Sequence, residues 1–136
     1  MSTIVENVRN WMQTCPLLDE DRTFLVDYLP DALAYSIDVL PVDPVYRRYV
    51  DGGALYRFEF AFTTKEAFDG DMRTLFDNSA FSENLSAWVR EQSRIGNLPV
   101  LEGHTARWVE VIASGYLITA DTDLAQYQSQ FRLVYS

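Results

Sequence analysis

The clearest pattern in the chain is the strict alternation of side chains between residues 54 and 63. One side of this segment is almost entirely aromatic and holds Ala54, Tyr56, Phe58, Phe60 and Phe62. The other side is mixed and holds Leu55, Arg57, Glu59, Ala61 and Thr63. A period of two over this length predicts a half-buried antiparallel strand over residues 54–64. Because Asp51-Gly52-Gly53 is a turn signal, residues 45–50 are expected to form the other strand of a hairpin.

Shorter alternating runs predict additional strands on both sides of the hairpin. These span residues 22–29, 34–40, 107–113, 116–120 and 124–135. Pro30-Asp31 is expected to turn the chain between the first two strands. Ser114-Gly115 is expected to break or bulge the strand between residues 107 and 120.

Helical spacing appears at the N-terminus and again in the middle of the chain. Thr3 and Glu6 form a capping box, which predicts a helix that runs until Pro16 stops it near Thr14. In the middle, residues 69–78 predict a short helix. A longer helix is expected to follow it, capped by Asn78-Ser79 and ending near Arg94, because Gly96-Asn97 and Pro99 come next.

The order of these elements predicts a single α+β domain over residues 1–136. We expect a twisted, mainly antiparallel sheet of about five to six strands, with an N-terminal helix and a central helical segment packed on it. A chain of 136 residues is long enough to bury its own core.

The charge balance narrows the classes of partner. The net charge is −9 and the isoelectric point is about 4.4, so the surface repels phosphate backbones and sequence-independent binding of DNA or RNA is not expected. No apolar run is long enough to span a membrane and the N-terminus lacks a signal sequence, which predicts a protein made in the cytoplasm. Ten of the eleven basic residues are arginine, which indicates either protein interfaces, where this cation is enriched, or a codon bias of the genome.

Residues suited to catalysis or metal binding are few. His104 is the only histidine, and its polar glycine-flanked segment predicts a solvated loop. Cys15 is the only cysteine and is expected to be a small semi-buried apolar residue. The carboxylate pairs at residues 69–71 and 121–123 lack the spacing of a calcium loop and are expected to shape turns. We therefore expect no enzyme activity, no cofactor and no metal.

The hairpin arginines are candidates for a contact with an acidic face of another subunit, and the alternative is that their long side chains simply extend into water. A two-residue loop would place Arg48 opposite Arg57, and a three-residue loop would place Arg47 there, so both registers bring two cations together. Glu59 is a candidate internal counter-ion, and a carboxylate of another subunit is the alternative. The last strand adds an uncharged polar row on the face opposite its aromatic residues, formed by Gln126, Gln128 and Gln130. This row is expected either to face another chain or to be an ordinary polar face.

Several of these segments together resemble the tail terminator, or tail completion, proteins of siphophages and prophages, which are sometimes described as minor capsid proteins. The resemblance runs over nearly the whole chain. It lies in Val26-Asp27-Tyr28-Leu29, Tyr35-Ser36-Ile37-Asp38, Tyr49-Val50-Asp51-Gly52, Phe58-Glu59-Phe60-Ala61-Phe62, residues 81–93, Gly96-Asn97-Leu98-Pro99-Val100, Ser114-Gly115-Tyr116-Leu117 and residues 127–135.

The resemblance implies a structural virion protein. Its subunits would form a homo-hexameric ring on the head-proximal end of the tail tube, stop growth of the tube and join the head–tail connector. DNA would pass through the ring without specific binding. The protein would be assembled in the host cytoplasm and reside at the head–tail junction of the virion.

Two other classes of function fit parts of the sequence. One is a small-molecule-binding module or enzyme with an aromatic-lined pocket between the sheet and the helical residues 81–89. The other is an acidic protein that binds a basic host partner, which would need its carboxylates clustered on one face. The acidic residues are scattered along the chain, which disfavours this last class.

Overall fold

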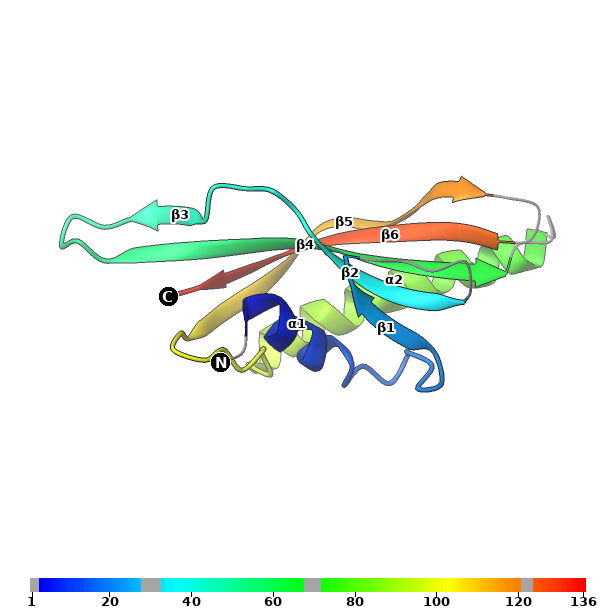
Figure 1. The fold of residues 1–136 in the computed structure, drawn as a ribbon, viewed down its shortest axis with the longest axis horizontal. Coiled ribbons are helices and arrows are strands. Elements are labelled where there is room, and N and C mark those ends of the chain that lie inside the picture. Colours follow the sequence, from blue (N-terminus) through cyan, green and yellow to red (C-terminus); the bar gives the residue numbers. More distant parts are fainter. Residues whose placement is uncertain (1–2, 28–32, 68–71, 121–123) are drawn as a thin grey trace.

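The computed structural model describes residues 3–27, 33–67, 72–120 and 124–136 and shows an α+β fold (Figure 1). The elements in chain order are α1 (Ile4–Met12), β1 (Thr23–Val26), β2 (Ala34–Val39), β3 (Val45–Arg48), β4 (Ala54–Ala67), α2 (Met72–Ile95), β5 (Ala106–Ala120) and β6 (Leu124–Tyr135). The α+β class, the N-terminal helix and the central helix agree with the prediction. None of the described helices is long and apolar enough to span a membrane.

The six strands form one twisted sheet in the order β1-β2-β4-β6-β5, and β3 pairs with the end of β4 that β2 leaves free. The central pair β4–β6 runs from Tyr56–Tyr135 to Ala67–Leu124 without a register shift. All pairings are antiparallel except β1–β2, which is parallel. The sheet is therefore mainly antiparallel, as expected, with one parallel edge that the sequence did not indicate.

Both helices pack on one face of the sheet (Figure 1). The aromatic side of the predicted hairpin strand faces them, and Phe60 and Phe62 are almost completely buried there together with Phe131 of β6. Trp11 of α1 and Trp88 of α2 lie 5.1 Å apart between ring centroids, so the two helices also contact each other. Burial of this layer supplies the main stabilisation of the fold.

The N-terminal helix begins where its capping signal placed it. The Thr3 hydroxyl accepts a hydrogen bond from the backbone N–H of Glu6 at 3.2 Å. Helix α2 ends one residue later than predicted and closes with Gly96 at a φ of +80°. The N–H groups of Gly96 and Asn97 donate to the carbonyls of Ser93 and Gln92, which is a Schellman motif.

The prediction of two helices in the middle of the chain is wrong, because α2 is continuous from Met72 to Ile95. Asn78-Ser79, the expected cap, lies in the interior of the helix. Neither residue breaks a helix as glycine or proline does, and the preference of asparagine and serine for a cap over a helix interior is weak.

The first strand is also shorter than predicted. β1 ends at Val26, because Asp27 adopts a left-handed conformation with a φ of +55° and turns the backbone. The expected turn at Pro30-Asp31 and the carboxylate pairs at residues 69–71 and 121–123 lie outside the described residues. Ser114-Gly115 produces a bulge rather than a break, since β5 is continuous across it.

Both predicted registers of the β3–β4 hairpin are wrong. The observed pairs are Val45–Tyr56, Arg47–Leu55 and Arg48–Ala54. Neither Arg47 nor Arg48 lies opposite Arg57, because the loop spans residues 49–53 and a bulge follows Val45. The like-charge pairing therefore does not occur.

Candidate functional site

Two surfaces hold the residues that the sequence singled out. One is the sheet face opposite the helices, which we call the polar face. The other is the β3–β4 hairpin, residues 45–57, which we call the arm and which projects beyond the helices in Figure 1. The arm and the polar face meet near β6, where Arg132 lies 5.7 Å from the ring centroid of Tyr46.

Side chains of the central strands form a hydrogen-bonded row across the polar face. Asp38 of β2 accepts from the hydroxyl of Thr63 at 3.1 Å, and the amide of Gln128 donates to Thr63 at 3.3 Å. The hydroxyl of Tyr116 in turn donates to Gln128 at 2.8 Å and accepts from the amide of Gln130 at 3.1 Å. The row therefore links four strands by side chains as well as by the backbone.

A second cluster on the same face is ionic. Arg132 of β6 donates to Glu59 and to Glu110, with both distances 2.9 Å. Desolvation lowers the pKa of Arg132, but the hydrogen bonds with these two carboxylates outweigh it and the pKa is raised overall. Trp108 donates to the other oxygen of Glu110, so both carboxylates are held in place. Glu59 is thus the partner of Arg132, not of the hairpin arginines.

The predicted glutamine row lies where the sequence placed it. Gln126, Gln128 and Gln130 alternate along β6 with buried residues of the helix-covered face. The side chains of Gln128 and Gln130 are occupied by Tyr116 and Thr63, so these two glutamines contribute to the polar face of the subunit itself. Their contact with another chain remains a prediction.

The three hairpin arginines have different surroundings. Arg57 is half-buried at the root of the arm, and its Nε donates to the carbonyl of Asp43 at 2.7 Å. Arg47 and Arg48 are exposed, and neither guanidinium has a hydrogen-bond or ion-pair partner in the described part of the chain. These two cations are available to a carboxylate of another molecule.

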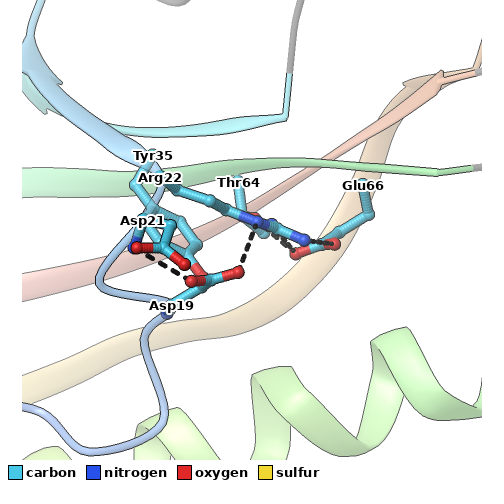
Figure 2. Close-up of polar contacts among 6 residues, drawn as sticks. All are labelled: Asp19, Asp21, Arg22, Tyr35, Thr64 and Glu66. Atoms are coloured by element: carbon cyan, nitrogen blue, oxygen red, sulfur yellow. Dashed lines mark hydrogen bonds and ion pairs between the residues drawn. The ribbon is translucent and has the colours of Figure 1, made fainter.

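A partly buried ion pair that the sequence did not reveal ties the segment before β1 to the sheet (Figure 2). Arg22 donates to both oxygens of Glu66, at 2.8 and 2.9 Å, and its guanidinium lies 5.3 Å from the ring centroid of Tyr35. The hydrogen bonds of Glu66 raise the pKa of Arg22. Thr64 donates to the same carboxylate at 2.8 Å. Because both carboxylate oxygens of Glu66 already accept hydrogen bonds, we interpret this cluster as a structural contact that stabilises the fold.

The structure also places the residues that the sequence raised as candidates for catalysis or metal binding. His104 is exposed in its predicted loop and packs edge-on against Tyr135 at 5.1 Å. In the described ranges no three His, Cys, Asp or Glu side chains are placed to hold a metal ion. An open hollow of about 470 Å³ lies between α1 and the segment after α2, lined by Asn7, Asn10, Trp11, Thr14, Asn97, Leu98 and Val100.

The space between α2 and the sheet, where an aromatic-lined pocket was the alternative expectation, is occupied by side chains of the core. Phe81 approaches Phe62 at 6.5 Å, and Leu85 and Val89 are almost completely buried in the same layer. The described hollows, of about 470, 250 and 370 Å³, are lined by residues that do not belong to α2.

The reactivity of Cys15 tests the packing of the hydrophobic core, to which this residue belongs. The thiol is buried, with a relative exposure of 3%, and burial raises its pKa above the ordinary value. The thiolate is the reactive form, so native Cys15 is expected to react with a thiol reagent at pH 8 much more slowly than the unfolded chain. A colorimetric thiol assay with and without denaturant measures this difference, and equal rates would contradict the buried position.

Comparison with known proteins shows the fold and no family. No family model matches the chain, and no protein with a curated description matches it. Solved structures do match, and one of them, a protein whose name states no function, aligns with a TM-score of 0.54. The alignment covers 96% of this chain and 89% of that chain at 13% identity. At this identity the likeness extends to the fold alone.

Proposed function

We propose that this chain is a subunit of a ring at the head-proximal end of a siphophage tail tube. The proposal starts from the ordered sequence segments that resemble tail terminator proteins. In this role the ring stops growth of the tube and joins the head–tail connector, and the subunit resides in the virion. The proposed partners are further copies of the chain, the tail tube protein and the connector.

The observation that carries the proposal is the arm. It projects from the body of the subunit and presents Arg47 and Arg48, which have no partner in the described part of the chain. A projecting hairpin with unpaired arginines is suited to contact a neighbouring chain, because arginine forms directional contacts with carboxylates. Each contact in a ring would be expected to bury about 800 Å² per partner.

The charge of the chain also supports a DNA channel. With a net charge of −9, the subunit as a whole repels phosphate. A ring that DNA must cross quickly benefits from such repulsion, because basic residues would retain the DNA through counter-ion release. The absence of specific DNA binding is therefore part of the proposal.

Deletion of the gene tests the function directly. In the phage or prophage that encodes the chain, we expect the deletion to give tails of irregular length that are not joined to heads, as seen by negative-stain electron microscopy. Expression of the wild-type chain from a plasmid should restore joined tails of uniform length. Particles with normal, head-joined tails after deletion would overturn the proposal.

A further inference from the structure

A strip of exposed apolar side chains lies on the edge strand β5. Within seven residues this strand presents Ile112, Tyr116 and Ile118, which are between 41% and 46% exposed. Leu117 is also exposed, but it pairs with Tyr127 and so lies on the helix-covered side of the strand. We call Ile112, Tyr116 and Ile118 the β5 strip. Exposed apolar side chains grouped on the edge of a sheet favour contact with another chain.

The arm carries a matching apolar tip at the other end of the molecule. Val50 is fully exposed and Tyr49 is 46% exposed, and both lie in the loop between β3 and β4. In Figure 1 this loop and the second half of β5 lie at opposite ends of the long axis. The tip therefore cannot reach the strip of its own chain, but it can reach the strip of a neighbour.

Charge complementarity favours a second copy of the chain as the neighbour. Arg47, Arg48 and Arg57, set against Asp51, give the arm a formal charge of +2. Because the whole chain carries −9, the remainder carries −11. The arm of one copy is thus attracted to the body of another, and opposite charges also steer the two copies together.

We infer that the β5 strip is the seat for the arm tip of a neighbouring copy. Tip and strip are different surfaces, so the contact is head-to-tail, and a contact of this kind closes into a ring when successive rotations complete a circle. Bulges at Ile112 and Ile118 interrupt the register of β5 with its neighbour β6. The contact is therefore made mainly by side chains rather than by a long backbone ladder. The inference deepens the proposed function, since it rests on a ring of identical subunits.

Disulfide trapping tests the seat in the full-length chain. Val50→Cys in one tagged preparation is mixed with Ile112→Cys, Tyr116→Cys or Ile118→Cys in an untagged one, and the mixture is oxidised. We expect at least one of these pairs to give several-fold more tagged–untagged dimer than the control pair of Val50→Cys with Val100→Cys. Val100 is the matched control because it is an exposed valine, 87% accessible, after α2. The buried Cys15 of the unmodified chain should give no dimer.

The outcomes separate the seat from the proposed function. Equal dimer yields from the strip pairs and the control pair would overturn the seat, even if the native mass still shows a ring. A strip variant that is trapped in assembled particles to a different protein would also overturn it. Dimers that form only with the strip variants, together with normal tails after gene deletion, would support the contact between arm tip and β5 strip and refute the proposed function. Circular dichroism of each variant confirms that these exposed substitutions leave the fold intact.

Discussion

Replacing Gly115 by alanine is expected to lower the free energy of unfolding by about 1–3 kcal/mol. A Cβ at this position would lie 2.1 Å from Oγ and 2.3 Å from Cβ of Ser82 on α2. Ser82 is only 4% exposed and its own Cβ is part of the clash, so relief requires β5 or α2 to shift. Glycine is needed here by the close approach of β5 to α2. Urea denaturation of the wild-type and variant chains measures the difference.

Two variants make the Gly115 prediction specific. Gly53→Ala is the control, because a Cβ there would meet only the side-chain oxygen of Asp51 at 3.3 Å and Tyr49 at 3.7 Å. Asp51 is exposed and its side chain can shift by a few tenths of an ångström, so a change of less than about 0.5 kcal/mol is expected. Ser82→Gly should recover part of the loss when combined with Gly115→Ala, minus about 1 kcal/mol for glycine inside a helix. If Gly115→Ala were as stable as the wild type, β5 would not approach α2 as closely as described.

Reversing the charge of the arm is expected to dissociate the assembly without unfolding the subunit. Arg47→Glu and Arg48→Glu each remove a cation that has no partner in the described part of the chain, so the free energy of unfolding should change by less than about 0.5 kcal/mol. Each variant also places a carboxylate against a negatively charged neighbour. Native mass spectrometry should then show a shift from the assembled state towards the monomer.

Arg90→Glu is the matched control for the arm. Arg90 is an exposed arginine on α2, and its reversal changes the net charge by the same amount as reversal of Arg47 or Arg48. Repulsion that comes only from total charge would dissociate all three variants equally. We expect the arm variants to dissociate and Arg90→Glu to remain assembled, and equal behaviour would show that the arm is not a specific contact.

Much of the fold follows from local patterns. The alternation in β4 and β6 predicted which side chains face the core, because a strand with one covered face must alternate. The cap at Thr3 and the glycine at position 96 fixed two helix ends, since both motifs satisfy backbone groups within a few residues. Such features depend on neighbours in sequence and can be read without the tertiary structure.

Other features depend on residues that are distant in sequence. The parallel pairing of β1 with β2 and the length of the hairpin loop are decided by how the sheet twists and packs. The contacts of Arg132 with Glu59 and Glu110 join three strands, with separations of 73 and 22 residues, and no local motif marks them. The candidate arginines were identified correctly as hairpin residues, but their pairing required the register that only the structure provides.

The native mass of the wild-type chain tests most directly whether this protein acts by joining copies of itself. The measurement is native mass spectrometry across a concentration series, alone and with the purified tail tube protein. The account predicts an assembly of six 15.7 kDa subunits, either in solution or once the tube is present. A chain that stays monomeric under both conditions at every concentration would contradict it.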